Sequence, residues 1–225
     1  MKAVIFGTSG MVGQGVLREC LLEAEITQVL SVVRSATGQS HAKLREVVHA
    51  DFLDFSRIEG ELTGYDACFF CLGVSSAGMT EEQYTRITYG ITMAAATTLA
   101  KLNPEMTFEY ISGTGTDSTE KGRSMWARVK GRTENALLAL PFKAAYMFRP
   151  GFIQALHGIK SKTRAYQIFY AVTTPLLPVL KAVFPQYVTT TERLGRAMIA
   201  VAKRGYPKKV LEMRDINSAS ESGNL

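Results

Sequence analysis

The chain has 225 residues, enough to bury one substantial core, and this length indicates one large domain. Hydrophobic residues make up 46% and charged residues 20%, which excludes a chain that is disordered or fibrous throughout. The net charge of +6 would favour an anionic partner, but no dense basic run interleaved with stacking aromatics occurs, so we expect no nucleic-acid partner.

The chain opens with a strand-like run, Lys2–Phe6, without the charged, apolar and small-residue order of a signal peptide. A cytoplasmic location is therefore expected. Three cysteines in apolar surroundings suit a reducing compartment better than a disulfide scaffold. Cys68 and Cys71 form a C-x-x-C spelling, but residues three apart in a strand point to opposite faces, so we expect no metal or redox centre there.

Short apolar runs alternate with longer helical patterns, which predicts βαβ units and a mostly parallel sheet with helices on both faces. The fold class is therefore α/β, as a single doubly wound domain over residues 1–215. Residues 216–225 are mostly small and polar and are expected to form a flexible tail. The predicted strands are Ala3–Phe6, Gln28–Val33, Leu44–Val48, Ala67–Leu72, Thr107–Ile111, Ala144–Phe148 and Val210–Met213.

A glycine-rich turn follows the first strand and leads into a predicted helix, Met11–Leu22, as a Rossmann-like dinucleotide site requires. In such a turn Gly7 permits the tight bend, Gly10 lets the backbone approach a diphosphate, and Gly13 lets the helix pack closely on the sheet. The free N–H groups and the positive dipole end of the helix then face the anion. The predicted cofactor-binding turn consists of Gly7, Thr8, Ser9, Gly10, Met11, Val12 and Gly13.

The residue type at the end of the second predicted strand indicates whether NAD or NADP is the preferred cofactor. An acidic residue at this place holds the ribose 2′-hydroxyl of NAD, whereas a cation accepts the 2′-phosphate of NADP. The strand ends in Val33, Arg34 and Ser35, with no acidic residue between Glu25 and Glu46. Arg34 therefore favours NADP over NAD; the alternative is an exposed arginine without a ligand.

The ends of the third and fourth predicted strands complete the cofactor edge. Asp51 and Phe52 follow the third strand, where the aspartate would accept a hydrogen bond from the adenine amine; an Asx turn is an equal alternative. The fourth strand ends in Cys71, Leu72 and Gly73, residues that would let the cofactor ribose and diphosphate pass.

Two further helices are marked by their ends. Thr80 and Gln83 predict a capping box at the start of a helix that extends to about residue 102. Another helix is predicted over about Glu192–Arg204, with Gly205 directly after it.

An apolar segment, Tyr166–Phe184, lies between these helices and contains two prolines. It is marginal in length for a membrane span, and no transmembrane segment is expected. We expect a broken helical flap within a substrate-cleft segment at about 150–190, with membrane-surface contact as the alternative.

The ordered set of motifs resembles the atypical short-chain dehydrogenases/reductases. The resemblance covers roughly residues 1–215 and is greatest to the small oxidoreductase-like proteins related to the Tat-interacting protein, with NmrA-type regulators and sugar-nucleotide epimerases further off. The motifs are the glycine turn, Arg34, Asp51-Phe52, Cys71-Leu72-Gly73, Ser112, the helix motif that ends in Lys130, and Phe148-Arg149-Pro150-Gly151.

The resemblance implies a catalytic set that this chain holds only in part. Active members carry a Tyr-x-x-x-Lys pair on one helix face, where the lysine lowers the tyrosine pKa and holds the nicotinamide ribose. Here Lys130 is present and Trp126 stands at the tyrosine position. The family serine corresponds to Ser112 or to Thr114, and Tyr84 is the alternative source of a phenol.

Two functions follow as hypotheses. The first is an NADP-dependent oxidoreductase or epimerase-like enzyme for a small, partly apolar substrate, with Lys130, Ser112 and Trp126 as its catalytic positions. The second is an NADP-binding regulatory protein of the NmrA type, which contacts a protein partner without turnover. The sequence leaves assembly as a homodimer open.

Overall fold

The core of the fold is a seven-stranded, wholly parallel sheet with the strand order β3-β2-β1-β4-β5-β6-β9. The computed structural model describes residues 1–159 and 188–221. The order reverses direction at β1 and β4, as in doubly wound sheets, and confirms the predicted fold class. The strands are β1 Lys2–Phe6, β2 Gln28–Val33, β3 Leu44–Val48, β4 Ala67–Phe70, β5 Thr107–Ile111, β6 Ala144–Arg149 and β9 Val210–Glu212.

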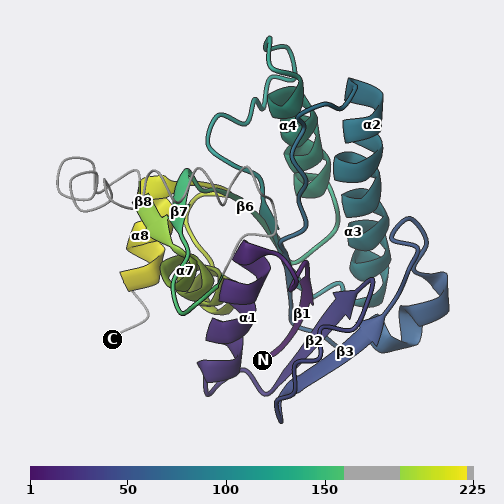
Figure 1. The fold of residues 1–225 in the computed structure, drawn as a ribbon, viewed down its shortest axis with the longest axis vertical. Coiled ribbons are helices and arrows are strands. Elements are labelled where there is room, and N and C mark those ends of the chain that lie inside the picture. The colour runs from purple at the N-terminus through teal and green to yellow at the C-terminus, as the bar shows by residue number, and fades with distance from the viewer. Residues whose placement is uncertain (160–187, 222–225) are drawn as a thin grey trace.

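Helices cover both faces of this sheet (Figure 1). One face carries α1, α7 and α8, and the other carries α3 and α4 together with η1. The described helices are α1 Met11–Leu22, η1 Ser56–Leu62, α2 Glu81–Thr85, η2 Arg86–Gly90, α3 Ile91–Leu102, α4 Met125–Leu138, α7 Thr191–Arg204 and α8 Met213–Glu221.

The strands are apolar on both sides because both faces of the sheet are buried. In β1, Ala3 and Ile5 contribute to the hydrophobic core under α1 and α7, while Val4 and Phe6 contribute to the core under α3. Successive side chains of the strand point to opposite faces of the sheet, so one short strand contributes to two hydrophobic cores. This explains why continuous apolar runs located all seven strands of the sheet.

The predicted helix over 80–102 is present but changes its winding. Thr80 forms the capping box with Gln83: the threonine hydroxyl accepts from the Gln83 N–H at 3.2 Å, and the Gln83 side chain accepts from the Thr80 N–H at 3.1 Å. A π-helical turn, Arg86–Gly90, then separates α2 from α3. Such a turn inserts an extra residue per turn and has no propensity signal of its own, so the sequence did not indicate it.

The C-terminal region differs from expectation in two places. Helix α7 begins at Thr191, one residue before the predicted start, because Thr190 caps it by accepting from the Arg193 N–H at 3.0 Å. Helix α8 takes in residues 216–221, which the sequence assigned to a flexible tail, because Ile216 and Ala219 are buried against α7.

A small second sheet pairs β7 Phe152–Gln154 with β8 Val188–Thr190 in parallel, and the sequence did not predict it. Three-residue strands are too short to show periodicity. The predicted flap Tyr166–Phe184 lies outside the described residues. In the parts of the chain that the structure covers, no helix is long and apolar enough to cross a membrane.

Glu109 is a charged residue type in the middle of the buried strand β5. Its side chain has no solvent exposure, and neither carboxyl oxygen has a hydrogen-bond partner among the described residues. Burial raises the pKa of Glu109 well above its usual range. The raised pKa favours the neutral form of the carboxyl group, which is an unsatisfied polar group among the described residues of an apolar layer.

We predict that Glu109→Met stabilises the protein at neutral pH by about 1–3 kcal/mol, because it removes an unsatisfied buried polar group without leaving a cavity. The folded-state pKa lies above the unfolded value of about 4.3, so the wild type loses stability as pH rises above that value while the variant does not. Urea unfolding between pH 4 and pH 8 measures this gain, which should grow with pH.

Glu105→Met is the control, since Glu105 lies exposed in the turn before the same strand. A Glu109→Met gain that stays constant over this pH range would show that the carboxyl group ionises normally in the folded protein.

Candidate functional site

The turn between β1 and α1 lies directly against the end of β4. Gly7 has φ +90°, and a Cβ atom there would lie 2.9 Å from the backbone of Cys71 and Leu72. A Cβ atom on Gly13 would lie 2.1 Å from the Gly7 carbonyl oxygen. Only glycine fits at these two positions, for the reasons that the sequence predicted: a tight turn and a close helix.

The start of α1 has no side-chain cap among the described residues. Gly10 is the N-cap residue, in extended conformation. A Cβ atom on Gly10 would meet only the Gly7 carbonyl oxygen, at an ordinary 3.4 Å, so the fold itself does not require a glycine here. The first N–H groups of α1 and its dipole can therefore face an anion that approaches the backbone closely.

The other residues of the turn divide between core and surface. The Thr8 hydroxyl is buried and lies 2.7 Å from the Ser31 hydroxyl of β2, so it ties the turn to the sheet. Ser9 is exposed, and its carbonyl oxygen accepts from the Gln14 side chain at 3.2 Å. Met11 and Val12 are partly buried against the core under α1. Thr8, Met11 and Val12 thus shape the turn, and Ser9 lies at its surface.

Arg34 is exposed directly after β2, at the edge of the sheet where the glycine turn lies. It makes no salt bridge with any residue in the described ranges. Its guanidinium group is therefore available to an anionic ligand at this edge.

A pocket of about 220 Å³ lies after β3, and Asp51 is part of its lining. Asp51 forms the Asx turn that was one of the two alternatives, because its Oδ1 accepts from the Leu53 N–H at 2.9 Å. Phe52 is only 7% exposed and packs edge-on against Phe6, with the ring centroids 6.2 Å apart. Phe52 therefore belongs to the core, and Asp51 is the residue of the pair that faces the pocket.

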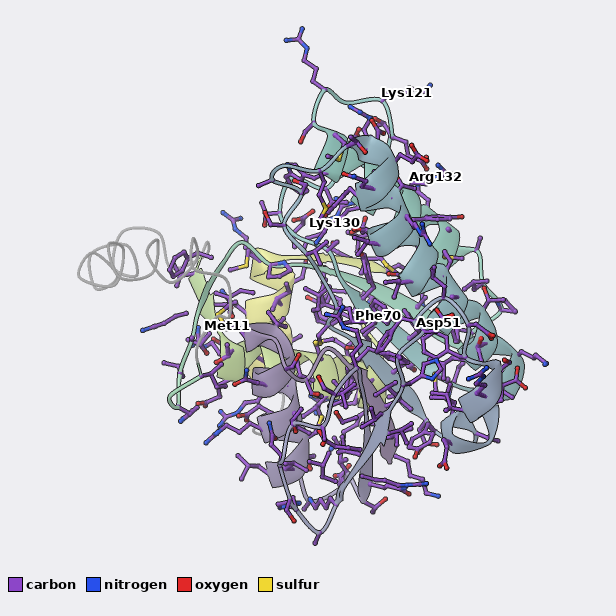
Figure 2. The ribbon with its side chains drawn as sticks, turned by 45° about the vertical axis from the view of Figure 1, so that its right-hand side comes forward. Met11, Asp51, Phe70, Lys121, Lys130 and Arg132 are labelled. Atoms are coloured by element: carbon purple, nitrogen blue, oxygen red, sulfur yellow. The ribbon has the colours of Figure 1, made fainter. Side chains whose placement is uncertain are left out.

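The residues after β4 lie between the glycine turn and the pocket that Asp51 lines. Cys71 is half-buried beneath Gly7, and burial raises the pKa of its thiol well above the usual range. Leu72 is half-buried, and a Cβ atom on Gly73 would meet no atom within 4 Å, so the chain leaves open space there. The labels of Met11, Phe70 and Asp51 follow this edge of the sheet in Figure 2.

Lys130 reaches the same edge from α4. Its ammonium group donates to the carbonyl oxygen of Ser112, the residue directly after β5. Burial lowers the pKa of Lys130 to about 8, while the negative charge of Glu134 acts in the opposite direction. The lysine that the resemblance identified therefore lies beside the strand-end serine, and its contact is with the backbone of that residue.

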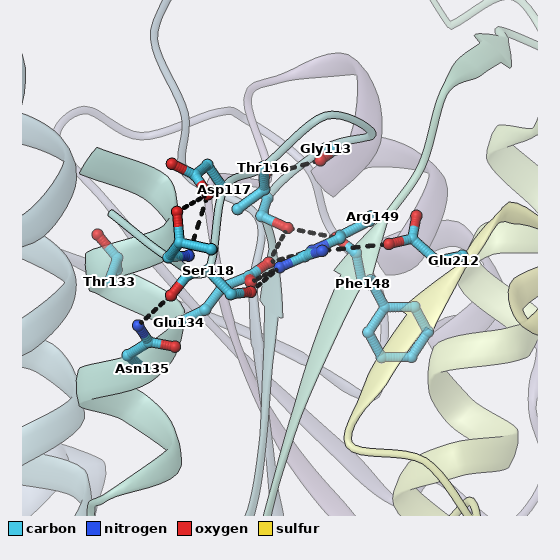
Figure 3. A network of polar contacts seen from close by, with 12 residues as sticks. Gly113, Thr116, Asp117, Ser118, Thr133, Glu134, Asn135, Phe148, Arg149 and Glu212 are labelled. Carbon is cyan, nitrogen blue, oxygen red and sulfur yellow. Dashed lines mark hydrogen bonds and ion pairs between the residues drawn. The ribbon is translucent and has the colours of Figure 1, made fainter. Parts of the chain in front are cut away.

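The Ser112 hydroxyl joins a buried ionic network with Glu134 and Arg149, two residues that Figure 3 labels near its centre. It donates to Glu134 Oε1 at 2.5 Å and lies 3.1 Å from the Phe148 carbonyl oxygen. Arg149 binds both carboxylate oxygens of Glu134, one through Nε at 3.0 Å and the other through Nη2. The Ser112 hydroxyl thus links β5 to α4 and β6. In this geometry its proton is directed at Glu134 and not at a ligand.

The same arginine also fixes the loop that separates β5 from α4. Arg149 Nη2 donates to the Ser118 hydroxyl at 2.5 Å, and Arg149 Nη1 lies 3.2 Å from Glu212 Oε1 of β9. Sequence reasoning missed Glu134 and the role of Arg149. The sequence did contain a signal for this buried ion pair: Glu134 is a charged residue on the same helix face as the apolar residues Ala127 and Leu137.

Trp126 lies one helical turn before Lys130 on α4 and is half-buried. Its ring packs on the turn after β5, since a Cβ atom on Gly115 would meet the indole Cη2 at 3.4 Å. The exposed Thr114 of this turn donates to the Arg149 carbonyl oxygen at 3.0 Å. Tyr84 is 2% exposed and close enough to Tyr110 to affect the pKa of that tyrosine, so its phenol lies in the core.

We predict that Gly13→Ala destabilises the protein by at least about 3 kcal/mol, because the new methyl group would overlap the Gly7 carbonyl and force the α1 helix away from the sheet. Urea or thermal unfolding measures the loss. Gly60→Ala is the matched control, since a Cβ atom there meets nothing within 4 Å and the change should be within about 0.5 kcal/mol of neutral. Equal effects at the two positions would contradict the close packing described for Gly13.

Comparison with known proteins identifies relatives along nearly the whole chain, although no family model matches it. The chain is 28% identical to the mitochondrial protein FMP52-2 of Scheffersomyces stipitis over 99% of its own length and 96% of that protein. It is 25% identical to the HTATIP2 protein of Rattus norvegicus over 66% of its length and 61% of that protein.

Among solved structures, DesIV of Streptomyces venezuelae, a dTDP-glucose 4,6-dehydratase with NAD and TYD bound, superposes with a TM-score of 0.71. The identity is 16%, and the match covers 95% of this chain and 75% of that one. Likeness at this identity shows the fold.

The expected cytoplasmic location is wrong. Fungal relatives from five genera, among them the protein of Scheffersomyces stipitis, are named mitochondrial proteins, which points away from the cytoplasm. The expectation came from the absence of a secretory signal, and that absence does not distinguish the cytoplasm from an organelle.

The sequence match to HTATIP2 agrees with the predicted resemblance to proteins related to the Tat-interacting protein, and the solved structure shares the predicted fold.

Proposed function

We propose that the chain binds NADP along the carboxyl edge of its sheet and works as an oxidoreductase or epimerase-like enzyme on a small, partly apolar substrate. The observation that carries the proposal is the uncapped start of α1, which lies in a glycine turn beside Arg34, an exposed arginine without a salt bridge to any described residue. A diphosphate and a further phosphoryl group match the two parts of this arrangement.

The residues present fit a dinucleotide. Gly7 and Gly13 let the turn and the helix pack closely, and no side chain among the described residues caps the first N–H groups of α1. Gly10 would admit the diphosphate, Asp51 in its pocket would face the adenine, and Gly73 would leave room for the ribose and diphosphate. This supports the proposed cofactor site, and the solved structure of similar fold named above contains bound NAD.

Arg34 supports NADP rather than NAD as the cofactor. Its guanidinium group is exposed, it ends the strand next to the glycine turn, and the chain offers no carboxylate in that position. A 2′-phosphate would receive charge-assisted hydrogen bonds there, whereas a 2′-hydroxyl would meet no acceptor.

When bound, a nicotinamide dinucleotide supplies or accepts a hydride. Lys130 would hold the substrate side of the site with an ammonium group that is already oriented by the Ser112 carbonyl. The Trp126 ring would shield this group from water. The Arg149–Glu134 pair keeps α4 in place beside β5 and β6, so it positions Lys130 without facing the substrate.

A second candidate function is a regulatory protein that binds NADP without turnover. Trp126 favours it, because an indole N–H donates a hydrogen bond but does not exchange its proton at neutral pH. The inward direction of the Ser112 hydroxyl favours it as well. Trp126→Tyr separates the candidates: carbonyl reduction by the variant alone, in an assay of NADPH consumption, would identify the natural protein as a binder.

Calorimetric titration with NADP and with NAD tests the cofactor site. We expect tighter binding of NADP to the wild type, and a loss of this preference by about 10- to 100-fold in Arg34→Ala, because the 2′-phosphate loses a charged partner. Gly10→Ala should weaken both dinucleotides, because its methyl group would occupy the approach to α1. Its unfolding midpoint should stay near that of the wild type, since the fold has room for the methyl group.

Arg204→Ala is the control for charge, since Arg204 is exposed at the far end of α7 and lines a groove with the last residues of α1. If neither dinucleotide binds to folded wild-type protein at millimolar concentration, the proposed function is wrong. An unchanged preference in Arg34→Ala would remove only the assignment of Arg34.

A further inference from the structure

The hydroxyl groups near the substrate side of the proposed site are already engaged as donors. The Ser112 hydroxyl donates to Glu134, and the Thr114 hydroxyl donates to the Arg149 carbonyl oxygen. Trp126 replaces the phenol that the resemblance implies and has no exchangeable proton of suitable acidity. Tyr84 is buried in the core. Within residues 1–159 and 188–221, the group with acidic protons that lies beside the end of β5 and is not bound to a carboxylate is the ammonium of Lys130.

The environment of Lys130 is unusual for a lysine. Its ammonium group is held by a neutral acceptor, the Ser112 carbonyl oxygen, and it forms no salt bridge within residues 1–159 and 188–221. Glu134, one helical turn further along α4, is the titratable group whose charge acts on it. That carboxylate already binds Ser112 and Arg149.

The charges behind Glu134 complete this arrangement. Arg149 of β6 neutralises the Glu134 carboxylate, and Glu212 of β9 in turn faces Arg149 at 3.2 Å. The pair therefore offers Lys130 little net negative charge. A half-buried lysine that lacks a carboxylate of its own gives up a proton more readily than a fully exposed lysine.

We propose that Lys130 itself is the proton donor and acceptor of this site, in place of the absent phenol. The inference rests on the proposed function. During reduction of a carbonyl compound, one N–H bond of the ammonium group breaks as an O–H bond forms on the carbonyl oxygen, while the carbonyl carbon receives the hydride that the cofactor supplies. The products are an alcohol, the oxidised dinucleotide and a neutral amine, which regains its proton from water.

The pKa of about 8 for Lys130 agrees with this role, because a proton donor works best when its pKa lies near the working pH. Trp126 agrees as well. Its ring covers the turn after β5 one helical turn from the amine, so it helps to exclude water where a tyrosine would have offered a competing proton.

The first test needs neither substrate nor cofactor. Apo wild-type protein is labelled with a trace of acetic anhydride at a series of pH values, and the acetylation of each lysine is quantified by mass spectrometry. Lys143, an exposed lysine in the turn before β6, is the internal control. We expect a midpoint for Lys130 at about pH 8, below the value of about 10.4 that is usual for a lysine side chain in water. Equal midpoints for the two lysines would overturn the inference without any bearing on cofactor binding.

The second test measures NADPH-driven reduction of a panel of aliphatic and aromatic aldehydes by wild type and Lys130→Arg. Arginine keeps the positive charge but does not release a proton below about pH 12. We expect kcat to fall by about 100- to 10,000-fold while the calorimetric affinity for NADP changes less than tenfold. In the wild type, kcat for reduction should fall as pH rises through about 8, because the reaction needs the protonated amine.

The outcomes separate the two proposals. Turnover that persists in Lys130→Arg, or an alkaline limb that does not follow the Lys130 labelling midpoint, overturns this inference alone. If wild type binds NADP but reduces no aldehyde while Trp126→Tyr does, the enzymatic proposal and this inference both fail and the regulatory candidate stands.

Discussion

The structure depends on one close approach, in which the turn after β1 presses against the end of β4 and the start of α1 presses against that turn. Glycine at positions 7 and 13 makes both contacts possible, and a single methyl group at either would collide with backbone atoms. This packing fixes where the helix begins relative to the sheet. It also leaves the first N–H groups of α1 without a side-chain cap, so the same contact that stabilises the fold creates a place for an anion.

A second constraint holds the opposite half of the site. Glu134 and Arg149 form a buried pair that joins α4 to β6, and the Ser112 hydroxyl adds β5 to it. Breaking such a pair by removing one partner costs about 3–5 kcal/mol, because it leaves the other charge buried and unpaired. The arrangement gives α4 a fixed rotation about its own axis. The faces of the helix that carry Trp126 and Lys130 therefore stay directed toward the end of β5.

Much of this architecture could be predicted from the sequence. Apolar runs located the strands because the sheet is buried on both faces, and the capping box at Thr80 marked its helix because the side-chain pattern is local. The positions of the glycine turn and of Arg34 could also be predicted from local sequence, because each comes directly after a predicted strand.

The features that sequence reasoning missed depend on contacts between distant residues. The direction of the Ser112 hydroxyl is set by Glu134, 22 positions away, so a serine expected to face a ligand is turned inward. Phe52 was assigned to the cofactor because it adjoins Asp51, yet its ring completes a cluster with Phe6 and Phe55. The π-helical turn at Arg86–Gly90 and the short strands β7 and β8 lack any periodic signal.

The pairing of β7 with β8 has a consequence for how such a fold can diversify. Because Phe152 lies beside Val188 and Gln154 beside Thr190, the intervening stretch of chain starts and returns at neighbouring points. The entropy of bringing two points of a chain together grows only slowly with the number of residues between them, so we expect this pairing to tolerate a change in that number. The proposed chemistry would be inherited with the rigid sheet, while selectivity for different molecules could evolve separately in a replaceable segment.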